Sequence, residues 1–129
     1  MRDLVSKIRE SEGFASFGRA TAEQIANAEE TLHLSFAEEY KDYLLAFGAA
    51  SFNGFELTGI CSSERLNVVT ETKRARERFG DFPQDAYVVE DALVDHALII
   101  QLANGEVYCY GPDDTKEKIA NSLEEYIAI

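Results

Sequence analysis

Residues that build disulfide frameworks and metal sites are scarce in this sequence. It contains two cysteines and two histidines among 129 residues, and Cys61 and Cys109 are too far apart for a CxxC motif. Two cysteines are too few for a disulfide framework or a zinc site, so we expect both thiols to be free and buried. No stretch rich in proline, glycine or serine divides the chain, which predicts one domain over residues 1–129.

Long apolar runs are also missing. No run approaches the roughly 18 residues that a membrane helix requires. The chain opens with Met1, Arg2 and Asp3, followed by an amphipathic pattern unlike that of a secretory signal. We therefore expect a cytoplasmic protein.

Basic residues are few, since 24 acidic residues stand against 12 basic ones and the formal net charge is −12. A field of that sign repels nucleic-acid phosphates and anionic lipids, so we expect neither nucleic acid nor a membrane to be bound directly. The same field attracts a basic protein, although acidic composition can also serve solubility alone. The hydrophobic fraction of 46% supports a folded core despite the charge.

The common catalytic motifs do not occur. The sequence has no GxSxG, phosphate loop, HExxH or dinucleotide fingerprint. Cys61 as a nucleophile with the pair Asp95–His96 as a base is an open alternative, but nothing in the sequence brings them together. Asp113–Asp114 lacks the spacing of a calcium loop and is typical of a turn. We expect no enzyme activity, no cofactor and no metal.

The spacing of apolar residues predicts five helices, at about residues 4–8, 21–33, 35–47, 64–79 and 115–127. Thr21 with Gln24, and Ser35 with Glu38, each have the spacing of a capping box at a helix start. A turn entering a strand is predicted at residues 52–58, and a further strand is predicted at residues 87–89. Because the strands do not alternate regularly with helices, the fold class is α+β, with an antiparallel sheet covered by helices on one side.

A hairpin is predicted around Asn104–Gly105, between strands at residues 97–102 and 106–110. A two-residue type I′ turn at this pair aligns Leu102 with Val107 and Ile100 with Cys109 on the core face. Tyr108 and Tyr110 then share the opposite face. That face is either a solvent-exposed protein-binding surface or is covered by a helix.

Four segments in the same order resemble the SUKH superfamily, which includes fungal regulators of cell-wall synthesis and many bacterial immunity proteins. The segment LHLSFAEEYKDYLL at 32–45 is similar to the family signature, and the other three segments are TAEQI with the following AE at 21–29, FNGFELTGI at 52–60 and IANSLEEYI at 119–127. The sequence departs from the family pattern at Phe36–Ala37, where Leu-Pro is common, and at 109–111, where an aromatic residue followed by Asp is common.

The resemblance implies an α+β fold with a mixed or antiparallel sheet wrapped by helices, and a role without catalysis. In bacteria such proteins look like antidotes encoded beside polymorphic or contact-dependent toxins, often nucleases, and each blocks its cognate toxin by direct binding. The implied partner is a basic toxin domain, which suits an acidic inhibitor. The alternative is a regulatory protein-interaction module similar to the fungal relatives.

We expect the partner to meet an acidic loop and the outer face of the hairpin. The acidic run from residue 90 to 95 is either a solvated loop or a patch that docks a basic protein. The candidate contacts are Glu56, Glu90, Asp91 and Asp95, with Tyr108 and Tyr110 as aromatic anchors.

Overall fold

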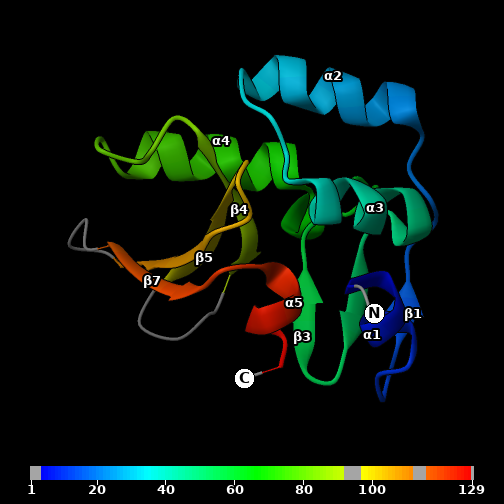
Figure 1. Ribbon diagram of the computed structural model, residues 1–129. Coiled ribbons are helices and arrows are strands. Elements are labelled where there is room, and N and C mark those ends of the chain that lie inside the picture. Colours follow the sequence, from blue (N-terminus) through cyan, green and yellow to red (C-terminus); the bar gives the residue numbers. More distant parts are fainter. Residues whose placement is uncertain (1–3, 92–96, 112–115, 129) are drawn as a thin grey trace.

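The computed structural model describes residues 4–91, 97–111 and 116–128. These residues form two antiparallel sheets with helices around them (Figure 1). The first sheet has the order β1 (Ala15–Ser16), β2 (Ala50–Phe52) and β3 (Phe55–Leu57). The second has the order β4 (Ala86–Asp91), β5 (Leu98–Leu102), β6 (Val107–Tyr110) and β7 (Lys116–Ala120). The predicted α+β class is confirmed.

The N-terminal half supplies three helices, α1 (Leu4–Arg9), α2 (Ala22–Leu32) and α3 (Glu38–Phe47). The capping box at the start of α2 is confirmed: the N–H of Gln24 donates to Oγ1 of Thr21 at 3.1 Å, and the N–H of Thr21 donates to Oε1 of Gln24 at 2.9 Å. The helix ends at His33, which adopts a left-handed conformation with φ of 56°.

The prediction of a second capping box, at Ser35 and Glu38, is wrong. The N-cap of α3 is Ala37, and no side chain caps the helix. The N–H of Ala37 instead donates to the hydroxyl of Tyr87 on β4, at 2.9 Å. A contact distant in the sequence therefore fixes this helix start, in place of a local one.

Helix α3 is fastened to the first sheet by two buried tyrosines. The Tyr40 hydroxyl donates to the carbonyl of Thr58 at 3.1 Å, and the Tyr43 hydroxyl donates to the carbonyl of Leu57 at 3.1 Å. Tyr43 also accepts from the N–H of Ala50 at 2.8 Å. Burial raises the pKa of both hydroxyls, which keeps them neutral.

Helices cover both faces of the second sheet, so the predicted one-sided cover is wrong. The rings of Tyr40 on α3 and Tyr87 on β4 lie 4.9 Å apart in the larger core cluster. On the opposite face lies α4 (Val68–Arg78), preceded by the 3-10 turn η1 (Glu64–Leu66). The smaller cluster on that face contains Ala75, Phe79, Phe82, Ala86, Val88, Leu98, Ile100 and Tyr110.

The hairpin between β5 and β6 is confirmed, but its predicted register is wrong by one residue. The observed pairs are Leu98 with Tyr110, Ile99 with Cys109, Ile100 with Tyr108 and Gln101 with Val107. The N–H of Gly105 donates to the carbonyl of Leu102 at 2.9 Å, and the N–H of Leu102 donates to the carbonyl of Glu106 at 3.0 Å. With Gly105 at φ of 99°, this is a three-residue loop with a bulge, not a two-residue turn.

The other Asn-Gly pair makes the two-residue turn. Asn53 and Gly54 have φ of 47° and 85° and connect β2 to β3, with Phe52 opposite Phe55. Positive φ at both central residues is the requirement of a type I′ turn. The segment predicted as a turn entering one strand is therefore the end of one strand, a turn and a second strand.

The predicted helix near the C-terminus is partly wrong. Residues 116–120 form β7, which pairs with β6 and aligns Ala120 with Val107. Only the short helix α5 (Leu123–Tyr126) follows, and the Ser122 hydroxyl accepts from the N–H of Glu125 at its start. Pairing with the sheet edge outweighs the helical spacing of Ile119 and Leu123.

Candidate protein-binding surface

Three of the six predicted contact residues meet where β3 runs beside β4. The N–H of Thr58 donates to the carbonyl of Val89 at 2.8 Å, and the N–H of Glu56 donates to Oε2 of Glu90 at 2.9 Å. Asp91 ends β4 and lines a small cavity of about 70 Å³ together with Glu56, Thr58, Arg65 and Leu66. The structure therefore brings Glu56, Glu90 and Asp91 into one region.

Both carboxylate oxygens of Glu90 are used inside the protein. Oε2 accepts from the N–H of Glu56 and Oε1 accepts from the Tyr126 hydroxyl on α5 at 2.5 Å. The side chain is partly buried, and burial raises the pKa of its carboxyl. Glu90 thus joins β3, β4 and α5, and the structure gives it an internal role that the sequence did not suggest.

Glu56 is held on the surface by Arg65. The two guanidinium nitrogens donate to the two carboxylate oxygens at 3.0 Å each. These hydrogen bonds lower the pKa of the Glu56 carboxyl and raise the pKa of the Arg65 guanidinium. The Glu56 side chain is still 44% exposed, so a partner can reach it.

The predicted acidic loop is only partly described. Asp91 is partly buried and lines a second cavity of about 220 Å³, with Glu71, Arg74, Ala75, Arg78 and Leu98. Burial raises the pKa of the Glu71 carboxyl beside it. Asp95 lies outside the described residues, as do His96 and the pair Asp113–Asp114.

The two candidate tyrosines have different surroundings. Tyr110 is 2% exposed, and the rings of Phe79 and Phe82 lie 5.2 and 5.3 Å from its own. Of the two alternatives for its face, cover by a helix is the one observed, and Tyr110 is a core residue. Tyr110 lies on the face opposite Cys109, as predicted, but the cluster beneath α4 covers that face, so the expectation of an exposed aromatic anchor at Tyr110 is wrong.

Tyr108 lies nearer the rim of the same face and is partly exposed. Its hydroxyl donates to Oε1 of Glu106 at 3.1 Å, and the ammonium of Lys116 lies 4.9 Å from its ring centroid. Lys118 donates to the other oxygen of Glu106 at 2.9 Å. Tyr108 is therefore part of a mixed-charge surface and remains accessible to a partner.

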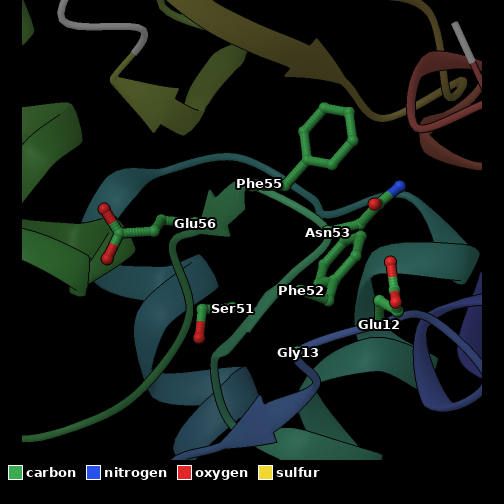
Figure 2. Close-up of a pocket in the computed structure, with 8 residues that line it drawn as sticks. Glu12, Gly13, Ser51, Phe52, Asn53, Phe55 and Glu56 are labelled. Atoms are coloured by element: carbon green, nitrogen blue, oxygen red, sulfur yellow. The ribbon is translucent and has the colours of Figure 1, made fainter.

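A hollow on the β2–β3 hairpin was not foreseen (Figure 2). It has a volume of about 470 Å³ and is lined by Glu12, Gly13, Ser51, Phe52, Asn53, Gly54, Phe55 and Glu56. Its position depends on the two-residue strand β1, which is too short to produce a recognisable sequence pattern. The Asn53–Gly54 pair, an established turn signal, is the one feature that could have located the hairpin.

Glu39 is the centre of a polar network that the sequence analysis also missed. Oε2 of Glu39 accepts from Nε2 of Gln101 at 2.7 Å and from the N–H of Leu123 at 2.6 Å, and Oε1 accepts from the N–H of Glu124 at 3.2 Å. Gln101 in turn accepts from the Tyr87 hydroxyl at 2.7 Å. Glu39 belongs to the signature-like segment and has a structural role there.

The alternative catalytic constellation gains no geometric support. The Cys61 thiol donates to the carbonyls of Ser63 and Leu66 at 3.7 and 3.6 Å, while His96 is not among the described residues. Cys61 and Cys109 are free thiols and partly buried. In the described ranges no group of three or more His, Cys, Asp or Glu residues is arranged to hold a metal ion, and no helix there is long and apolar enough to span a membrane.

Comparison with known proteins places the chain in a family. The model of the SUKH_5 family, described as "SMI1-KNR4 cell-wall", matches residues 1–128, so this protein belongs to the SUKH superfamily. A crystal structure of a protein from Pseudomonas syringae pv. tomato has the same fold, with a TM-score of 0.77 and 13% identity over 96% of this chain and 92% of that one. No curated protein sequence matches.

Proposed function

We propose that this protein is an immunity protein that binds and neutralises a cognate secreted toxin domain of a polymorphic or contact-dependent system. It acts in the cytoplasm by direct protein contact, without catalysis, cofactor or metal. Membership in the SUKH superfamily supports this role, because the family resemblance implies antidote proteins in bacteria. The partner is a basic domain, with a nuclease as the leading candidate.

The division of charge in the structure is the observation that carries the proposal. Arg65, Arg74 and Lys118 each pair with a glutamate, at 3.0, 2.9 and 2.9 Å. Arg76 donates to two backbone carbonyls at 2.7 and 3.1 Å. Part of the limited positive charge is therefore compensated within the protein, and each of these three ion pairs uses one carboxylate.

Many carboxylates, in contrast, face solvent. Exposed carboxylates with no ion pair among the described residues include Glu12, Glu23, Glu30, Asp42, Glu77, Asp81 and Asp85. A nuclease holds phosphates with basic side chains, so an acidic protein is complementary to its substrate groove or to the rim of that groove. The same field disfavours nucleic acid or an anionic membrane as the direct partner.

A second candidate function comes from the family description, which refers to cell-wall proteins. In that case the chain is a non-catalytic regulatory module that binds cellular proteins and neutralises no toxin. The two functions differ in a simple way, because only an immunity protein restores growth to a cell that produces the toxin.

Co-expression tests the proposal. The C-terminal domain of the polypeptide encoded directly upstream is produced in a sensitive host with and without this chain, and complex formation is measured by pull-down. We expect restored growth and a stable complex with this protein, and no rescue by an unrelated acidic protein of similar size. Neither rescue nor binding would overturn the immunity role and favour the regulatory module.

A further inference from the structure

We propose that the outer face of the three-stranded sheet is the docking surface for the toxin, and that its hollow receives an arginine side chain of that partner. This inference rests on the proposed function, which it makes more specific. The hollow is the one of about 470 Å³ on the β2–β3 hairpin. Typical small-ligand sites range from about 300 to 1,000 Å³, so one inserted side chain and its flanking backbone fit.

The strand register explains why this face is hollow. Ser51 pairs with Ala15 on one side and with Glu56 on the other, so these three residues form a row across the sheet. Side chains alternate along a strand, and Phe52 and Leu57 point the other way into the core. The outward row therefore contains two small residues and one acid, and Ala15 is exposed.

Carboxylates flank the hollow on both sides. Figure 2 shows Glu12 and Glu56 on opposite sides of the hairpin, and they are the two charged residues of its lining. Glu12 is exposed, and within the described ranges no hydrogen bond or ion pair engages its carboxylate. Glu56 is paired with Arg65, which is not part of the lining, so Glu12 is the charged group of the lining that no cation of the described residues compensates.

Uncharged groups of the lining also suit a guanidinium. The Ser51 hydroxyl and the Asn53 side-chain carbonyl belong to the same lining and can accept hydrogen bonds. Arginine fits better than lysine because its planar fork of five donors can engage several separated acceptors at once.

The first test uses the full chain and a chemically defined probe. Backbone amide shifts are followed by NMR while N-acetyl-Gly-Arg-Gly-amide is added, and the matched control peptide carries citrulline, which has nearly the same shape without the charge. We expect the arginine peptide, and not the citrulline peptide, to shift the amides of Ser51, Asn53, Gly54 and Glu56. Equal shifts with both peptides, or shifts elsewhere only, would overturn the arginine site.

A matched pair of variants sharpens this result. Glu12→Gln removes one carboxylate of the hollow, and Glu30→Gln removes an exposed carboxylate on α2 that does not line it. We expect Glu12→Gln to raise the peptide's Kd by about two- to fivefold, the range for an exposed ion pair, and Glu30→Gln to leave it unchanged. An unchanged Kd in Glu12→Gln contradicts the proposed role of that carboxylate.

The toxin experiment separates the docking surface from the function. Ser51→Arg fills the hollow with a positive side chain, and its folding is checked by circular dichroism and Tm. We expect the folded variant to lose rescue and toxin binding while Glu30→Gln retains both. If Ser51→Arg protects as well as the unaltered protein, the docking surface is wrong and immunity stands. If the unaltered protein fails to protect, the immunity role is wrong, and the peptide titration decides whether the hollow binds arginine.

Discussion

The backbone N–H of Glu56 on β3 donates a hydrogen bond of 2.9 Å to the side-chain Oε2 of Glu90 on β4. A carboxylate thus replaces the backbone carbonyl that normally accepts between neighbouring strands. The pairing of β4 with β5 shifts between Val88 and Glu90, which leaves Val89 unpaired in that ladder. The Val89 carbonyl accepts instead from Thr58 at 2.8 Å, so this irregularity allows the two sheets to join.

The first prediction concerns the pH dependence of stability through Glu90. Burial raises the pKa of its carboxyl, so the folded chain binds the proton more tightly than the unfolded chain. Glu90 therefore contributes stability that is fully present below the unfolded pKa, about 4.3, and lost as pH rises through the raised folded value. Glu90→Gln should remove this part of the pH dependence in urea titrations.

The size of the effect at neutral pH follows from the two hydrogen bonds. In Glu90→Gln the amide oxygen can accept from Glu56 while the amide nitrogen donates to the Tyr126 hydroxyl, so we expect a change within about 1 kcal/mol. Glu90→Ala leaves both partners unsatisfied and should cost about 1–3 kcal/mol. If the stability of Glu90→Gln depends on pH in the same way as that of the unaltered protein, the first prediction is wrong.

Glu56 provides a control, because its contribution to stability changes with pH in the opposite direction. Arg65 lowers the pKa of its carboxyl, so Glu56 contributes stability that is present above the unfolded pKa and is lost as pH falls through the folded value. Because the side chain is 44% exposed, solvent screening keeps this contribution small. Glu56→Gln should therefore change the pH dependence slightly and in the direction opposite to Glu90→Gln.

The second prediction is that Glu39 stabilises the fold while its neighbour Glu38 does not. Glu39→Ala removes an acceptor for Gln101 and for two backbone N–H groups at the start of α5, and should cost about 2–4 kcal/mol in the free energy of unfolding. The Glu38 side chain is 90% exposed and pairs with Lys41 at 3.3 Å, so Glu38→Ala should change the free energy of unfolding by no more than about 0.5 kcal/mol. If chemical denaturation shows equal losses in the free energy of unfolding for Glu39→Ala and Glu38→Ala, the stabilising role of the Glu39 network is wrong.

The third prediction concerns three glycines packed backbone to backbone. A Cβ on Gly48 would lie 1.8 Å from the carbonyl oxygen of Gly18, and a Cβ on Gly59 would lie 1.7 Å from that of Gly48. Gly48→Ala or Gly59→Ala should therefore lower the free energy of unfolding by more than about 4 kcal/mol or prevent folding. Gly80→Ala is the control, since no atom lies within 4 Å of its added Cβ, and it should fold normally by circular dichroism.

The fourth prediction applies to the proposed toxin complex. Attraction between an acidic inhibitor and a basic domain accelerates their encounter, and salt screens this attraction. The association rate should fall markedly between low and physiological ionic strength, where the Debye length is about 8 Å, while the dissociation rate changes less. Stopped-flow mixing at several salt concentrations measures both rates. An association rate that does not depend on salt would remove the electrostatic part of the proposal.

Local signals in the sequence succeeded where neighbouring residues determine the structure. Thr21 and Gln24 satisfy each other's backbone groups, so the start of α2 could be read directly. The two Asn-Gly pairs show the limit of such signals. Asn53–Gly54 adopts the two-residue turn, whereas Asn104 is not in the positive-φ region and the loop there takes one residue more. That one residue moved the β5 side chains to the other face, so Ile99 joins the larger core cluster with Cys109, and Ile100 joins the cluster beneath α4 with Tyr110.

The candidate surface could be predicted only in part, because it is assembled from distant segments. Glu56 and Asp91 line the same small cavity, as expected of an acidic surface, but the internal partners of Glu90 come from β3 and α5. The pairing of β1 with β2 brings Glu12 to the hollow, and a strand of two residues is too short to be predicted from the sequence. Residues 116–120 form a strand because they pair with β6, and this pairing could not be predicted from their own sequence pattern.

The arrangement of the hairpin has a consequence for protein engineering. Ser51 and Glu56 point away from the core, while Phe52 and Leu57 beside them complete it. The outward positions can therefore be randomised in a library with little risk to folding, and the inward positions kept as a fixed frame. Under the proposed immunity function, selection for survival against a panel of toxins would then yield antidotes of new specificity from a single scaffold.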